Sequence, residues 1–259
     1  MLTVFGDILN WLAAGVLFPL LALPLASLGK TRRAAAAIWF ALIGAIIGGA
    51  MAFANLAVDL AAPKWTPALA LAVIGGVGVC GAFVLVAGAD ALAARLASVF
   101  SGIVTRIGRL SLHLVILMAG VQFAIVILRY VFGVNFIAMQ ESVTYMHGGV
   151  FLLAGGYALL TDDHVRVDIF YREARPRRKA LVDLAGTYLF LFPFCLIALW
   201  AAGPYVANSW FVREGSMEQS GIKGVFLLKT LIPVYLTLLA LAGFVIAARA
   251  AETLKTRSG

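Results

Sequence analysis

The sequence predicts an all-α integral membrane protein with about seven transmembrane helices and one interfacial amphipathic helix. Hydrophobic residues make up 63% of the chain and charged residues only 12%, and no ordinary soluble domain reaches the mean hydropathy of +1.01. Apolar runs of about 20 residues recur, which is the length that crosses a hydrocarbon core roughly 30 Å thick. Almost all of the 20 basic residues lie in short segments outside these runs, as in membrane-surface loops, so nucleic acid is not an expected partner.

The predicted spans are, in order, 9–28, 35–58, 66–88, 110–132, 142–161, 181–203 and 226–248. The first run has no basic segment before it and is expected to be a span rather than a signal peptide. Between the third and fourth runs, Arg95, Arg106 and Arg109 recur at helix-like intervals among apolar residues, which indicates a helix lying along the interface. This gives an extension at 1–89 with three spans, an interfacial helix at 90–109 and a four-helix domain at 110–259.

Individual residues within the spans predict packing rather than chemistry. Pro193 interrupts the sixth run between apolar neighbours and indicates a kink. Gln122 is the one strongly polar side chain near the centre of a span, and a hydrogen bond to a neighbouring helix is expected. Small residues recur at Gly148 and Gly155, and at Gly149 and Gly156, so one side of the fifth span allows close approach, either within the chain or to another subunit.

The distribution of basic residues predicts the orientation. Fifteen of the 20 Lys and Arg residues fall in segments 30–33, 90–109, 161–179 and the tail from 249, which lie on one side of the membrane. The other five, on the opposite side, are Lys64, Arg129, Arg213, Lys223 and Lys229. Because basic residues are retained in the cytoplasm, the N-terminus is expected in the periplasm and the C-terminus in the cytoplasm.

The acidic residues avoid the predicted midplane, where an ion or proton pathway would require them. His113 and His147 would differ in depth by roughly 15 Å, which is too far apart to share one haem iron. The chain is therefore not expected to be an enzyme, and no catalytic residue, metal ligand or cofactor site is assigned to it. Two alternatives remain open at this point, a free-standing seven-span carrier or sensor and a membrane anchor subunit of a redox enzyme.

Several short motifs follow one another through the last 150 or so residues. They are "QES" at 140–142, "GGYALLTDDHVRVDIFY" at 155–171, "RPRRK" at 175–179, "SW" at 209–210, "EGSMEQSGI" at 214–222 and "LLKTLIP" at 227–233. In this order and placement relative to four apolar runs, the chain from about residue 107 resembles the small membrane subunit of tripartite ATP-independent periplasmic (TRAP) transporters, the DctQ family. The first hundred residues depart from the compact four-span form of that family.

The resemblance implies a three-part system that imports organic acids across a bacterial inner membrane. A periplasmic binding protein would capture the solute, and a large membrane subunit would bind sodium ions and move the solute with them. The present chain would be a fixed scaffold beside the large subunit, with membrane lipids around it. The solute cannot be identified from this chain, because specificity would belong to the other two components.

Candidate contact residues lie at both predicted membrane surfaces. At the cytoplasmic corner, His164, Arg166 and Asp168 would lock the chain against the large subunit, or would form a solvated loop beside lipid headgroups. Glu141 and Lys229 lie near the outer ends of two spans and are considered as a salt-bridge pair. The outer loop, placed at 204–225, is a candidate docking site for the periplasmic protein or an ordinary interface anchor. Its residues are Trp210, Arg213, Glu214, Glu218 and Ser220.

Overall fold

The computed structural model describes residues 18–43, 77–163 apart from 79 and 83, and 171–256. It is all-helical as predicted, and no residue within these ranges belongs to a β-strand. Four helical segments in the described part are long and apolar enough to span a membrane. The first three predicted spans lie largely outside the described residues, so seven spans stays a prediction. In this part of the chain the structure shows the short helices α2 (Phe18–Leu21) and α3 (Leu23–Ala26), and helical residues at 32–43, 77–78, 80–82 and 84–87.

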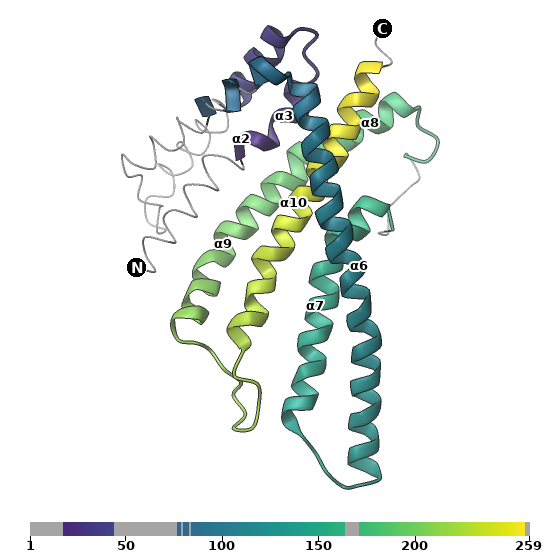
Figure 1. Ribbon diagram of the computed structural model, residues 1–259, viewed down its shortest axis with the longest axis vertical. Helices are drawn as coiled ribbons and strands as arrows, with labels where there is room; N and C mark the ends of the chain where they lie inside the picture. Colours follow the sequence, from purple (N-terminus) through teal and green to yellow (C-terminus); the bar gives the residue numbers. More distant parts are fainter. Residues whose placement is uncertain (1–17, 44–76, 79, 83, 164–170, 257–259) are drawn as a thin grey trace. The chain divides into compact units, whose positions relative to one another are not determined.

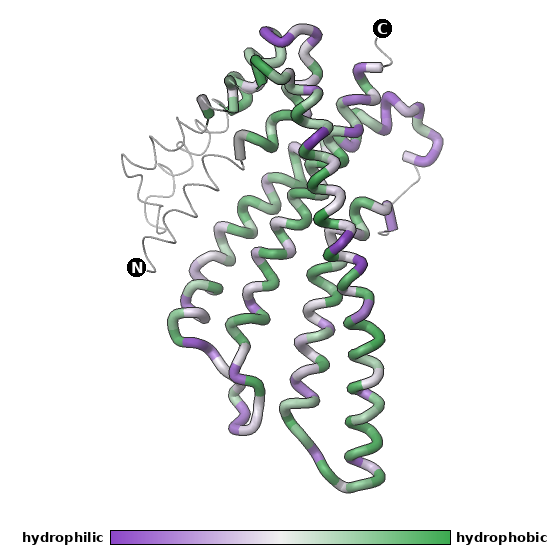
Figure 2. The backbone as a smooth tube through the Cα atoms, viewed as in Figure 1, coloured by the Kyte–Doolittle hydropathy of each residue, from purple (hydrophilic) through white to green (hydrophobic). Residues whose placement is uncertain are grey.

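The four span-length segments correspond to the last four predicted runs (Figure 1). They are α6 (Ala89–Tyr130), α7 (Ile137–Thr161), the continuous segment Pro176–Phe211, and α10 (Val225–Thr256). The third segment consists of α8 (Pro176–Gly186), a π-helical turn (Thr187–Leu191) and α9 (Phe192–Phe211). Figure 2 shows long hydrophobic stretches in all four segments. The first segment, α6, also has hydrophilic residues near its middle, where Arg106 and Arg109 lie, and is mainly hydrophobic after them.

The predicted boundary between an interfacial helix and the fourth span is not a helix boundary. Gly88 has a φ of +83° and precedes the helix, and α6 then runs through 42 residues without interruption. No proline lies between Ala89 and Tyr130, and Gly102 and Gly108 keep the helical conformation. Residues 90–109 therefore continue the same helix as the span, which would extend for about 63 Å if straight. Whether its first half lies at the interface stays a prediction.

The predicted irregularity at Pro193 takes the form of a π-helical turn just before it. The N–H of Phe192 bonds to the carbonyl of Thr187, five residues back. Since Pro193 has no N–H to donate, the preceding turn can widen without breaking a regular bond to that residue. The hydroxyl of Thr187 donates to the carbonyl of Asp183 at 2.7 Å, which fixes the start of the wide turn.

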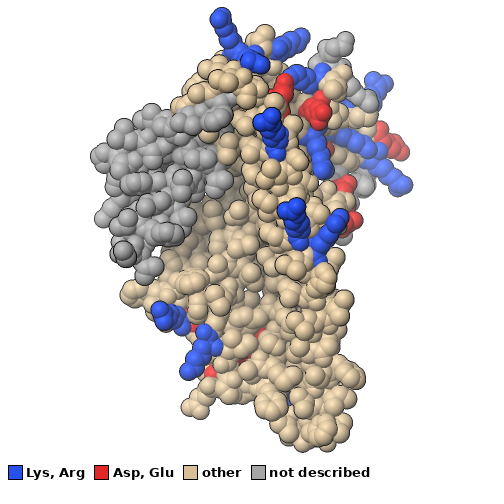
Figure 3. Space-filling model, viewed as in Figure 1, with Lys and Arg blue, Asp and Glu red and all other residues tan. Residues whose placement is uncertain are grey.

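The chain separates into two compact units. The first contains residues 1–97, 175–181 and 247–259, and the second contains 98–174 and 182–246. In the first unit, Trp39 is fully buried and packs edge-on against Phe40, and a Cβ added to Gly81 would lie 2.6 Å from the Phe40 ring. Lys255 and Asp90 form an ion pair in the same unit. Figure 3 shows a group of Lys and Arg side chains at the top of the view and a smaller group at the lower left.

The core of the second unit joins α6, α7 and α10. Val104, Leu238 and Ala242 are buried together, with Tyr157 and other apolar side chains packed around them. A Cβ at Gly156 would lie 2.9 Å from the Leu238 carbonyl oxygen, so only glycine permits this approach of α7 to α10. The small-residue pattern of the fifth predicted span therefore serves packing within the chain.

Candidate functional site at the α9–α10 loop

The loop between α9 and α10, residues 212–224, begins with a helix-terminating turn at Arg213. Arg213 has a φ of +48°, and its N–H bonds to the Trp210 carbonyl at 3.3 Å. The next N–H, of Glu214, bonds to the Ser209 carbonyl at 3.0 Å. This pair of bonds is the Schellman motif, which usually has glycine at the left-handed position. The turn ends α9 and directs Glu214 toward α10.

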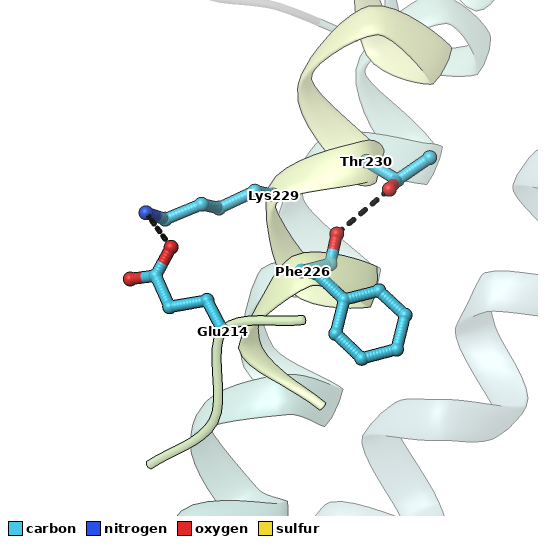
Figure 4. A network of polar contacts seen from close by, with 4 residues as sticks. All are labelled: Glu214, Phe226, Lys229 and Thr230. Atoms are coloured by element: carbon cyan, nitrogen blue, oxygen red, sulfur yellow. Dashed lines mark hydrogen bonds and ion pairs between the residues drawn. The ribbon is translucent and has the colours of Figure 1, made fainter. Parts of the chain in front are cut away.

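Glu214 forms an ion pair with Lys229 on the first turns of α10 (Figure 4). Their Oε2 and Nζ atoms are 2.5 Å apart, and the Lys229 ammonium also lies 4.0 Å from the centre of the Tyr205 ring of α9. The Lys229 side chain is 15% exposed and that of Glu214 37% exposed. The hydrogen bond from Lys229 lowers the pKa of the Glu214 carboxyl below its usual value. The pair therefore links both flanking helices to the loop.

Trp210 is held by contacts to α10 rather than pointing freely outward. Its indole Nε1 donates to the Thr230 hydroxyl at 2.8 Å, and its ring meets that of Phe226 edge-on at 4.8 Å. Thr230 in turn donates to the Phe226 carbonyl at 2.8 Å, as drawn in Figure 4. Trp210 therefore fastens the end of α9 to the start of α10, although its ring remains 47% exposed.

Glu141, in the first turns of α7, holds the middle of the same loop. Its Oε2 accepts a hydrogen bond from the backbone N–H of Ile222 at 2.6 Å, and its Oε1 accepts one from the Ser216 hydroxyl. The Ser216 backbone N–H also bonds to the Ile222 carbonyl at 3.1 Å, which closes the loop. Charge-assisted hydrogen bonds of this kind are about twice as strong as neutral ones.

Gly221 is required by this arrangement. A Cβ on Gly221 would lie 2.7 Å from the Glu141 Oε1 atom and closer still to the Ser216 hydroxyl. Its N–H donates to the Glu218 carbonyl at 3.1 Å, which closes a tight turn over residues 218–221. The glycine thus allows the turn to pass directly over the carboxylate.

Glu141 and Lys229, which the sequence offered as a pair, have different partners. The α9–α10 loop supplies Glu214 to Lys229, and it supplies Ser216 and Ile222 to Glu141. The sequence does not predict the contacts that Ser216, Ile222 and Thr230 make here. The motif "EGSMEQSGI" contained a signal for the loop contact, because a glycine within a polar outer loop marks a tight turn.

Of the docking candidates in this loop, Arg213, Glu218 and Ser220 are exposed, as is the neighbouring Met217. The N–H of Glu218 bonds to the Ser216 hydroxyl at 3.1 Å, so the exposed segment rests on the part held by Glu141. The loop therefore presents these side chains from a fixed backbone. Their role in docking stays a prediction.

The three residues of the predicted cytoplasmic corner, His164, Arg166 and Asp168, lie outside the described residues. On one side of them, α7 ends at Thr161 and Asp162 has a φ of +61°. On the other side, the Tyr171 hydroxyl lies 2.8 and 3.0 Å from the two carboxylate oxygens of Asp183, and so donates to that group. Asp162, Tyr171, Asp183 and Thr187 line a hollow of about 370 Å³ together with apolar side chains.

Comparison with known proteins identifies one family. The family model for tripartite ATP-independent periplasmic transporters, DctQ component, matches residues 114–255. This range contains α7, the segment Pro176–Phe211, almost all of α10, and the whole α9–α10 loop. No curated protein sequence and no solved structure gives a significant match.

Proposed function

Because the chain belongs to the DctQ family, the small membrane component of TRAP transporters, we propose that it is a fixed scaffold for sodium-coupled uptake of organic acids. Members of this family work with a large membrane subunit and a periplasmic binding protein. In the proposed arrangement the large subunit binds the sodium ions and moves the solute. The present chain supports that subunit from the side and supplies a surface for the binding protein.

The placement of charge along the four described spans carries this proposal. Residues 110–128, 142–161, 184–211 and 230–248 contain no Asp, Glu, Lys or Arg. Carriers build their solute and ion sites near mid-depth from charged side chains or broken helices. The charged contacts that the structure describes at the α9–α10 loop, Glu214 with Lys229 and Glu141 with the Ile222 N–H, instead fix the ends of helices. A rigid bundle with charged ends is suited to support rather than to alternating access.

We further propose that the chain lies in a bacterial inner membrane with the α9–α10 loop in the periplasm. The orientation rests on the excess of basic residues at the opposite, cytoplasmic side, where they would meet lipid headgroups. The exposed Arg213, Glu218 and Ser220 would then face the binding protein. His164, Arg166 and Asp168 would face the large subunit at the cytoplasmic corner.

Uptake into proteoliposomes tests the scaffold role. With an inward sodium gradient and the solute-loaded binding protein outside, the chain alone should give no uptake above empty vesicles. Adding the large subunit should restore it, and the large subunit without this chain should be less active. Sodium-driven uptake by the purified chain alone would contradict the proposal.

Docking of the binding protein is tested separately with charge-reversing substitutions. Arg213→Glu and Glu218→Lys should each raise the KM for the loaded binding protein several-fold, because reversing an exposed charge slows encounter with a complementary surface. The amount of assembled membrane complex should not change. If the KM is unaltered in both variants, the loop is only an interface anchor.

A further inference from the structure

A shallow hollow between α6 and α7 has polar as well as apolar residues in its lining, in the part of both helices that is expected to lie in hydrocarbon. The two helices run antiparallel, and a Cβ on Gly149 of α7 would lie 3.2 Å from a methyl group of Leu114 on α6. Closer to their outer ends a hollow of about 480 Å³ opens between them. It is lined by Met118, Ala119, Gln122, Val143, Thr144 and His147.

This hollow lies within the apolar part of both helices. Gln122 is seven residues before Arg129, and His147 is six residues after Glu141, so both lie about 10 Å from the charged ends of their helices. His147 is nine positions from Gly156, so at 100° per residue it lies on the opposite side of α7 from Gly156, where α7 meets the Leu238 carbonyl of α10. The hollow therefore faces away from that contact.

The polar side chains in the hollow have unused hydrogen-bonding capacity. Gln122, Thr144 and His147 are exposed, and within the described part of the chain no side-chain hydrogen bond reaches the Gln122 amide or the His147 ring. The only described contact of the His147 ring is stacking on Phe151 of the same helix. An amide left unsatisfied in hydrocarbon costs several kcal/mol, and polar residues in spans almost always face other protein.

We propose that this α6–α7 groove receives a transmembrane helix of the large membrane subunit that carries a hydrogen-bonding side chain. The inference rests on the proposed function for the identity of the partner. The chemistry of the groove selects the kind of helix, because Gln122 offers two amide donors and one carbonyl acceptor. The small side chain of Ala119 lets a partner backbone approach beside these groups. A helix with only aliphatic side chains would leave them unpaired.

Photocrosslinking tests where the partner lies. A photoreactive p-benzoylphenylalanine replaces Ala119 in the full chain, co-expressed with the large subunit of the same transporter. We expect an adduct at the combined mass of the two subunits. The control site is Leu117, which is 56% exposed and points to the opposite side of α6, and it should give little or no such adduct.

Replacing Gln122 and His147 tests whether their side chains form hydrogen bonds with the partner helix. Gln122→Leu and His147→Leu should each weaken binding of the large subunit in micelles by roughly three- to fifteenfold, the range for one interhelical hydrogen bond in a membrane. Gln122→Asn should retain most of the affinity, and Leu117→Ala should retain it fully. Leucine exposed to lipid is favourable, so the Leu variants leave the isolated chain folded.

The outcomes separate this inference from the proposed function. If the wild-type chain binds no large subunit, both fail. If it binds the large subunit but Ala119 links to a second copy of this chain, to another part of the same chain or to nothing, the groove assignment is overturned. It is equally overturned if both Leu variants bind as tightly as wild type, because the groove then faces only lipid.

Discussion

Glu141 is the residue that holds the middle of the α9–α10 loop through its carboxylate. Glu141→Ala removes the acceptor for the Ile222 N–H and the Ser216 hydroxyl, so two part-buried donors lose their protein partner. We expect a lower midpoint of thermal unfolding and faster proteolysis within residues 212–224. Glu141→Gln, which keeps an acceptor oxygen, should lose less.

The matched control is Glu218→Gln in the same loop. Glu218 contributes its backbone N–H and carbonyl to the loop, and its exposed side chain makes no contact that the described structure records. Substitution there should leave both measurements unchanged. Equal proteolysis rates for Glu141→Ala and Glu218→Gln would show that the carboxylate does not hold the loop.

The ion pair of Glu214 should make the stability of the protein depend on pH. Its pKa lies below the usual 4.5 because Lys229 donates to the carboxylate, so the folded state favours the ionised form. This contribution is fully present above the pKa of the unfolded chain and disappears as the pH falls through the lower folded pKa. The difference in unfolding midpoint between wild type and Glu214→Gln should therefore be largest near pH 7 and shrink toward zero in acid. A difference that stays constant down to about pH 3 would contradict the role of the ion pair.

The residues of the outer loop were easier to select from the sequence than to pair. Glu141, Glu214, Trp210 and Lys229 stood out because charged and aromatic side chains mark the ends of apolar runs. Their partners depend on the Schellman turn at Arg213, a non-glycine residue in a left-handed conformation. No local pattern signals such a turn, and without it the direction of the loop, and hence the partner of each carboxylate, is undetermined.

Among the elements, contact between α7 and α10 depends on glycine. Gly156→Ala would place a methyl group 2.9 Å from the Leu238 carbonyl oxygen, which is backbone and cannot turn aside. The helices must then separate, and we expect a loss of about 1–3 kcal/mol, seen as a lower unfolding midpoint in detergent. Gly102→Ala in α6 is the control, since nothing lies within 4 Å of the added Cβ. Its midpoint should be unchanged or higher, because alanine is the better helix former.

The sequence located the last four spans but not the ends of their helices. Hydropathy locates the apolar part of a span, and each of the last four predicted runs overlaps one span-length segment. The helices continue beyond those limits because Arg177, Arg178 and Lys179 at the start of α8 favour helix as well as apolar residues do. Residues 90–109 are helical as predicted, but the spacing of their arginines did not show that the helix continues into the span.

At the scale of the whole molecule, the orientation across the membrane can be tested with described residues at the two predicted surfaces. Met217 is fully exposed in the α9–α10 loop, and Arg177 is exposed at the start of α8. In intact cells, Met217→Cys should react with a membrane-impermeant maleimide, because the loop is expected in the periplasm. Arg177→Cys should react only after the cells are permeabilised, because α8 begins in the basic segment expected in the cytoplasm.

The two native cysteines should add little background to this labelling experiment. Cys80 and Cys195 are both buried, so a water-soluble maleimide does not reach their thiols. The unsubstituted chain should therefore give the background signal, and a Cys80→Ala, Cys195→Ala chain should match it. Labelling of Arg177→Cys but not Met217→Cys in intact cells would reverse the orientation. The loop held by Glu141 would then face the cytoplasm, where it could not meet a periplasmic binding protein, and the docking proposal would fail with it.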